Sequence, residues 1–247
     1  MLQSNHHKEI QEFKVLIKDQ PLEKQLAILA AQFPGKVVFS TSFSEEDQLI
    51  THYIFTQHLS ITVFTLDTGR LFPETYSTWS QTLEKYKQPI VPYYPIAADL
   101  EKFIEEKGPN SFYESVDNRK ECCRIRKVVP LQRALKGQEL WITGIRAEHS
   151  PNRLSMEPIE WDAVNNIIKF HPLMNWESDT VKKAINQYDI PVNPLHAKGF
   201  VSIGCAPCTR AIKSGEDFRA GRWWWEDSSK KECGLHVTEI ITSETRV

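Results

Sequence analysis

Short apolar runs alternate with longer segments of helical periodicity along most of the chain. The apolar runs predict buried strands at residues 36–40, 61–66, 90–94, 140–143 and 167–170. Apolar residues at helical spacing predict helices at residues 8–19, 22–33, 46–59, 73–87, 117–135 and 178–188, with a break or kink at Pro130 in the fifth of these. Strands that alternate with helices in this way are typical of an α/β fold with a mostly parallel sheet.

Ligands of such sheets bind beyond the carboxyl ends of the strands, so the segments after the strands are the first candidates for a site. Three such segments are residues 40–47 (Ser-Thr-Ser-Phe-Ser-Glu-Glu-Asp), 67–70 (Asp-Thr-Gly-Arg) and 144–146 (Gly-Ile-Arg). Hydroxyl groups and helix-start amides in the first segment could hold a phosphate or a sulfate. Taken alone, however, the first segment is better explained as a helix start capped by Ser44, and the second as a turn.

Composition and charge exclude few classes of protein. The chain has 247 residues, of which 40% are hydrophobic and 25% charged, which is ordinary for a soluble globular protein. Its net charge of −2 gives no reason to expect nucleic acid or an anionic membrane as a partner. No apolar run approaches the roughly 20 residues that span a bilayer, and the N-terminus lacks the apolar stretch of a secretory signal. We therefore expect a cytoplasmic protein.

The five cysteines carry the strongest chemical signal. Cys122 and Cys123 are adjacent, Cys205 and Cys208 form a C-x-x-C pair, and Cys233 stands alone. In a reducing compartment, clustered cysteines bind metal or act in catalysis more often than they form disulfides. Four thiolates satisfy either a zinc ion or a four-iron cluster. Adjacent ligands suit the bulkier cluster better, but the spacing alone leaves both open.

Several cations accompany these cysteines. Lys230, Lys231 and His236 flank Cys233 and would favour its reactive thiolate, although an ordinary exposed cysteine explains the local sequence equally well. Arginine recognises sulfate and phosphate oxygens with a planar fork of donors. Candidates for holding an anion are Lys127, Arg146, Arg153, Arg219 and Arg222, of which Lys127, Arg146 and Arg153 could instead be surface charges.

Together these motifs resemble those of the assimilatory adenylyl-sulfate and phosphoadenylyl-sulfate reductases. The matching stretches occur in the family's order, at residues 40–47, 66–69, 122–133, 141–153, 202–210, 215–225 and 231–236. The resemblance implies an adenine nucleotide alpha-hydrolase-like fold, related to the PP-loop proteins. It divides the chain into an N-terminal helical extension (residues 1–33), a reductase domain (34–225) and a mobile C-terminal tail (226–247). One departure is Ser44-Glu45, where many relatives have Gly-Ala.

The resemblance also implies a reaction, in which adenylyl sulfate (APS) is reduced to sulfite and AMP. Cys233 would be the nucleophile and form an S-sulfocysteine, which thioredoxin or a glutaredoxin-like reductant would resolve. A [4Fe-4S] cluster would be held by Cys122, Cys123, Cys205 and Cys208, and Lys127 and His236 would assist catalysis. The implied substrate-binding residues are Ser40, Thr41, Ser42, Asp67, Thr68, Gly69, Gly144, Arg146, Arg153, Arg219 and Arg222.

Three alternatives remain. The first is a reductase of the 3′-phosphorylated substrate (PAPS) or of both nucleotides, although family members that use PAPS mostly lack the four cysteines. The second is an ATP-cleaving adenylating enzyme of the same broad fold, which would be expected to carry an S-G-G-x-D-S loop that residues 40–45 do not match. The third is a zinc-stabilised binding module, which leaves residues 219–236 without a role. A homo-oligomer is compatible with each.

Overall fold

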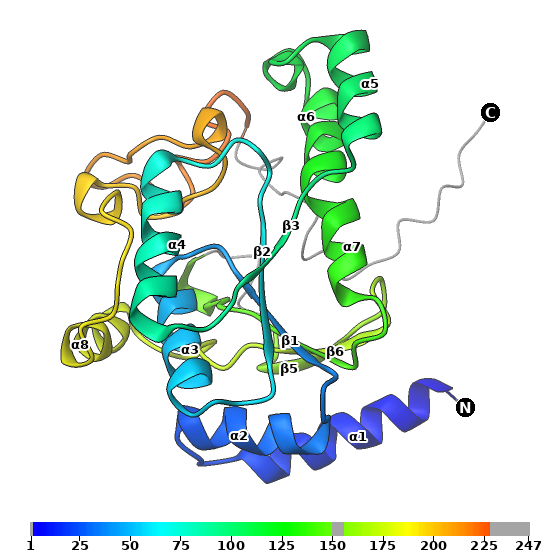
Figure 1. The fold of residues 1–247 in the computed structure, drawn as a ribbon, viewed down its shortest axis with the longest axis vertical. Coiled ribbons are helices and arrows are strands. Elements are labelled where there is room, and N and C mark those ends of the chain that lie inside the picture. The colour runs from blue at the N-terminus through cyan, green and yellow to red at the C-terminus, as the bar shows by residue number, and fades with distance from the viewer. Residues whose placement is uncertain (1, 150–155, 228–247) are drawn as a thin grey trace.

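A computed structural model describes residues 2–149 and 156–227 and has one twisted sheet at its centre (Figure 1). The order of the strands is β3-β2-β1-β4-β6-β5. Neighbouring strands pair in parallel, except that β5 runs antiparallel to β6. The strands are β1 (Val37–Thr41), β2 (Thr62–Leu66), β3 (Val91–Tyr93), β4 (Leu140–Ile142), β5 (Ile159–Asp162) and β6 (Ile167–Phe170).

Helices cover both faces of the sheet. The helices are α1 (Leu2–Ile17), α2 (Leu22–Gln32), α3 (Glu45–Thr56), α4 (Pro73–Tyr86), α5 (Ala97–Lys107), α6 (Val116–Cys123), α7 (Val129–Leu135) and α8 (Ser178–Gln187). Figure 1 shows α3, α4 and α8 on one side and α5, α6 and α7 on the other. Within the described ranges, no helix is both long and apolar enough to cross a membrane.

Two apolar cores follow from the alternation of side chains along the strands. In β1, Val37 and Phe39 belong to the larger core, whereas Val38 faces a smaller core under α7. The helical extension expected at residues 1–33 is indeed helical, and its Phe13 and Leu26 pack into the larger core. The N-terminal helices therefore share a core with the sheet.

The predicted α/β class and its parallel sheet are confirmed. The predicted strands and helices lie within a few residues of their predicted bounds, except that the first helix, α1, begins six residues earlier than predicted. The break predicted at Pro130 is not there: the helix instead widens into a π-turn over Arg124–Val128. Pro130 lies in the first turn of α7, where a missing N–H is tolerated. Two elements were not predicted, namely α5, whose described buried side chain is Phe103 alone, and the short strand β5.

The strand order sets the place of a ligand. The chain moves outward from β1 to β2 and β3, and then returns to the other side of β1 for β4 and β6. The direction of winding therefore reverses between β1 and β4. In open parallel sheets this reversal leaves a crevice beyond the carboxyl ends of the two strands, where ligands bind.

Candidate active site

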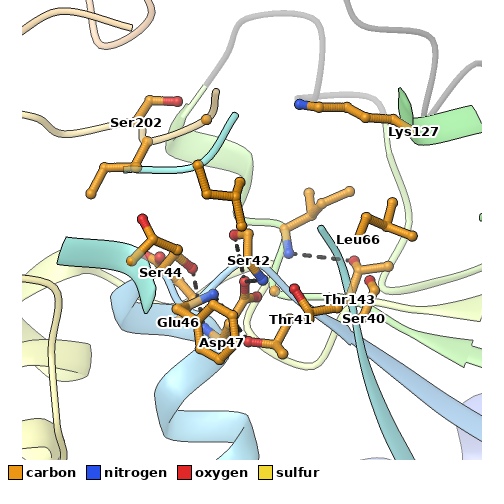
Figure 2. A pocket seen from close by; sticks show the side chains of 18 of the residues that line it. Ser40, Thr41, Ser42, Ser44, Glu46, Asp47, Leu66, Lys127, Thr143 and Ser202 are labelled. Atoms are coloured by element: carbon orange, nitrogen blue, oxygen red, sulfur yellow. Dashed lines mark hydrogen bonds between the residues drawn. The ribbon is translucent and has the colours of Figure 1, made fainter. Parts of the chain in front are cut away.

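A cavity of about 250 Å³ lies at this crevice. Segments that follow β1, β2 and β4 form its floor, and residues 201–204 and 218–223 close it from the other side. Figure 2 shows Lys127 and Ser202 across the cavity from Asp47 and Thr143. Eight of the predicted site residues line it, namely Ser40, Thr41, Ser42, Thr68, Lys127, Gly144, Arg219 and Arg222.

The loop from β1 to α3 is held by its own side chains. The Asp47 carboxylate accepts hydrogen bonds from the Ser42 amide at 2.6 Å and from the Ser42 hydroxyl at 2.7 Å. Ser44 caps α3 by accepting from the Asp47 amide, as the sequence predicts. Phe43 adopts a left-handed conformation with φ 62°, which turns the chain tightly into the helix. The loop is therefore rigid before any ligand arrives.

Asp47 lies where the loop meets β4. A Cβ atom at Gly144 would lie 2.1 Å from Asp47 Oδ1, so Gly144 permits this close approach. Burial raises the pKa of the Asp47 carboxyl to about 6, although the hydrogen bonds from Ser42 act in the opposite direction. Above that pH, the floor of the cavity carries a buried negative charge.

The turn after β2 is built around Asp67. Its Oδ1 accepts from the Gly69 amide and from the Tyr76 hydroxyl, both at 2.8 Å. Gly69 has φ +68°, a conformation that favours glycine. Thr68 consequently lines the cavity, whereas Asp67 and Gly69 stabilise the turn and are not among the described residues that line it.

Cations gather on the opposite side, where Lys127, Arg219 and Arg222 line the cavity. Arg222 is 7% exposed, and its guanidinium packs over the Trp223 ring at 4.7 Å. On its other side, Gly204 leaves no Cβ atom in the way of the guanidinium. The Arg222 Nε is buried and has no hydrogen-bond partner among the residues that the structure describes. A buried guanidinium with an unused donor at a cavity is suited to an anionic ligand.

The four clustered cysteines meet beside this cationic side. Cys122 and Cys123 end α6, and Cys205 and Cys208 bracket a short 3₁₀ turn. A second cavity, of about 20 Å³, is lined by all four cysteines and by the cations Arg70, Arg119, Arg126 and Lys127. All four cysteines are free thiols, and three of them are buried.

The environment of the four thiols is uneven. Burial raises the pKa of Cys208 to about 12, and a second thiol at Cys205 adds to the effect. Burial also opposes ionisation of Cys205, but the Lys127 cation and the Thr68 hydroxyl outweigh it and lower the pKa of that thiol. In the part of the chain that the structure describes, no three His, Cys, Asp or Glu side chains stand close enough together to hold a metal ion.

Comparison with known proteins shows to which family the chain belongs. The phosphoadenosine phosphosulfate reductase domain matches residues 36–211, which include β1 to β6 and all four clustered cysteines. The chain belongs to this reductase family. A protein from Sinorhizobium fredii, named adenosine 5'-phosphosulfate reductase, is 49% identical over 90% of this chain and 88% of its own length. A protein of the same name from Allochromatium vinosum is 47% identical over 83% of this chain and 80% of its own.

Solved structures agree on the fold. A phosphoadenylyl-sulfate reductase from Candida auris, in complex with phosphate, covers 83% of this chain with a TM-score of 0.71 and 25% identity. Yeast FAD synthetase, in complex with FAD, matches with a TM-score of 0.51 and 17% identity, which supports the fold alone. The predicted adenine nucleotide alpha-hydrolase-like fold is thus confirmed for this member of the reductase family.

Lys127 connects the two cavities of this reductase. It lines both of them, and it lies on the π-turn that joins α6, which carries Cys122 and Cys123, to α7. Arg126, its neighbour, donates to the Thr68 carbonyl at 2.6 Å, so the turn after β2 is tied directly to the cysteine helix. A wide turn in a helix often marks a functional site.

Arg146 contacts protein groups in this structure. It is buried, and within the described residues it does not line the large cavity, because its guanidinium contacts Glu46 and Glu148, each at 2.9 Å. The direct contact of Arg146 with substrate stays a prediction. Arg153, Cys233 and His236 lie outside the described residues, and their roles stay predictions.

Sequence reasoning missed several residues of the cavity, among them Glu46, Asp47, Trp141, Thr143 and Trp223. The acidic pair at the start of α3 was explained as helix capping, which is also correct. Trp141 and Thr143 follow the alternation of β4, and only the strand order reveals that Thr143 faces the crevice. Trp223 packs in a buried cluster with Cys123, Cys205 and Cys208.

Proposed function

We propose that this reductase converts APS to sulfite and AMP. The observation that carries the proposal is the cavity at the sheet crevice, with Lys127, Arg219 and Arg222 on the side next to the four cysteines. The name adenosine 5'-phosphosulfate reductase, shared by relatives that are 47–50% identical, supports the same activity.

The shape of the cavity supports one orientation of the nucleotide. The floor formed by the loops after β1, β2 and β4 would take the nucleoside, as crevices of parallel sheets do. The phosphate and sulfate would lie toward Lys127 and Arg222, because buried cations offset the charge that otherwise repels an attacking thiolate. This orientation directs the sulfate toward the cysteine-rich side.

The reaction needs a nucleophile and a reductant. Cys233 is our candidate nucleophile, since the other four cysteines line the small cavity together and would be committed to the cluster. Its thiolate would attack the sulfate sulfur, the bond from sulfur to the bridging oxygen would break, and AMP would leave. A thiol of thioredoxin or a glutaredoxin-like protein would then attack Cys233 Sγ and release sulfite with the bonding electron pair. The second thiol of that reductant would free Cys233, leaving the reductant as its disulfide.

A [4Fe-4S] cluster on Cys122, Cys123, Cys205 and Cys208 fits the donor set. The described lining of the small cavity holds four thiols and four cations, and it contains no carboxylate that would compete with the thiolates. A bound cluster would supply anionic charge, and Lys127 would be oriented between it and the substrate. Such chemistry suits the cytoplasm, where thiols stay reduced.

Preference for APS over PAPS is supported by the acidic floor. Asp47 lines the cavity across from Lys127 (Figure 2). Above its pKa of about 6, the Asp47 carboxylate would repel an additional phosphate on that side. The solved phosphoadenylyl-sulfate reductase is only 25% identical, whereas relatives named for APS approach 50%.

One experiment tests the proposal. Protein purified without oxygen should contain about four iron and four sulfide per chain and release sulfite from APS when thioredoxin is present. PAPS should give a much lower kcat/KM. Sulfite release that is equal or faster with PAPS would overturn the substrate preference, and no sulfite from either nucleotide would overturn the function. Stoichiometric zinc without sulfide would instead support a zinc site.

A further inference from the structure

Arg146 contacts three separate segments behind the floor of the nucleotide cavity. Its Nη1 donates to the Trp176 carbonyl at 3.1 Å, and its Nη2 donates to the Ser178 hydroxyl at 2.8 Å. The same guanidinium forms ion pairs with Glu46 of α3 and with Glu148, and its side chain is only 3% exposed. Protein groups therefore contact the guanidinium on several sides. Arg146 thereby connects the segment after β4 to α3 and to the start of α8.

Glu46 brings this contact to the cavity. It lies in the first turn of α3 and lines the cavity, yet its side chain is only 9% exposed. Its Oε1 lies 2.9 Å from Arg146 Nε. A carboxylate that is nearly buried and close to an anionic ligand would repel that ligand unless a cation compensates it.

We propose that Arg146 is a positioning residue: it orients Glu46 and neutralises its carboxylate, which allows the cavity to accept an anionic nucleotide. Arg146 acts through Glu46 and does not touch the ligand. The inference rests on the proposed function only for the identity of the ligand as a nucleotide. It assigns to this arginine a role different from the substrate contact that its sequence position suggested.

The expected effect is selective for charge. At an effective dielectric constant near 20, one uncompensated charge within about 10 Å of a phosphate weakens binding on the order of tenfold. Arg146→Met should therefore weaken AMP binding about tenfold or more and leave adenosine binding within about twofold, because adenosine has no phosphate. A structural defect would instead weaken both ligands alike.

The test is isothermal titration of AMP and adenosine to the full-length holoprotein and its variants. The double variant Glu46→Gln/Arg146→Met should recover AMP affinity, since it removes the carboxylate together with its partner. Arg146→Lys should keep the ratio of AMP to adenosine affinity near that of the wild type, because it keeps the cation. Equal losses for AMP and adenosine in Arg146→Met, or no recovery in the double variant, would overturn the proposal.

Glu46→Gln alone keeps the proposal falsifiable should Arg146→Met fail to fold. It removes negative charge while Arg146 remains, so AMP should bind severalfold more tightly and adenosine should be unchanged. AMP binding that is unchanged or weaker in Glu46→Gln would also overturn the proposal. Failure of the wild-type protein to bind either ligand would count against the proposed function instead, which separates the two conclusions.

Discussion

A single methyl group at Gly204 should displace the main buried cation of the cavity. A Cβ atom there would lie 2.3 Å from Arg222 Nη2, 2.5 Å from Cζ and 2.7 Å from Nη1. Comfortable contacts between heavy atoms begin at about 3.5 Å, so the guanidinium must move by roughly 1 Å in Gly204→Ala. Gly204 is not in a left-handed conformation, and alanine should therefore not strain the backbone there.

The displacement should appear as lost affinity for the phosphate group. A hydrogen bond to a charged group contributes about 1.5–3 kcal/mol, so its loss weakens binding by roughly 10- to 150-fold. Isothermal titration with AMP measures this loss directly, and adenosine serves as the ligand that lacks the phosphate. The cysteine cavity lies close by, so iron content should be measured in the same preparation.

A double-mutant cycle shows whether Arg222 carries the effect. In an Arg222→Met background, Gly204→Ala should cost nothing further, because there is no guanidinium left to displace. AMP affinity that is unchanged in Gly204→Ala would refute the reasoning. So would a loss of the same size in the Arg222→Met background, since it would trace the effect to the loop and not to the cation.

The remaining predictions concern the acidic floor and the cysteines. Because burial raises the pKa of Asp47 to about 6, its neutral form stabilises the fold fully below the ordinary pKa of 3.8, and this stabilisation is lost as the pH rises through about 6. The difference between these two pKa values corresponds to about 3 kcal/mol. Asp47→Asn should therefore gain stability relative to the wild type between pH 4 and pH 7 in thermal melts. Melting temperatures of variant and wild type that change in parallel with pH would contradict this. Cys233→Ser should keep its iron and bind AMP but release no sulfite, whereas wild type given APS without reductant should carry a sulfonate on Cys233 by peptide mass mapping. An adduct on another cysteine would rule out this nucleophile. Cys205→Ser should lose iron and sulfide together, and full retention of both would exclude Cys205 as a ligand.

Periodicity predicted the sheet well because its signals are local. Each parallel strand is buried on both faces and shows as a short apolar run, such as residues 61–66. The helix α5 was missed although Leu100, Phe103 and Ile104 lie at helical spacing, because the stripe is short and only Phe103 among them is buried. The π-turn was not predicted. The irregularity was expected at Pro130 instead, since proline at the start of a helix and proline inside one give the same sequence signal.

The candidate site was predicted by residue type but not by partner. Many of the residues singled out after the strands line the large cavity, because parallel strands bring their carboxyl ends to one edge. Pairings across long sequence separations have no local signature. The contact of Arg146 with Glu46, which lies 100 residues away in the sequence, is one case, and the close approach of Arg222 to Gly204 is another. Such pairings decide which arginine can contact a ligand and which contacts other groups of the protein.

The wide turn at Arg124–Val128 behaves as one surplus residue within a longer helix. Each residue of a regular helix rotates the next by about 100°, so deleting one here would restore a regular helix but turn Cys122 and Cys123 away from Cys205 and Cys208. A descendant of this chain could therefore not lose the surplus residue and keep its cysteine group. The length of this helix and the placement of its cysteines are therefore coupled, and they can only change together.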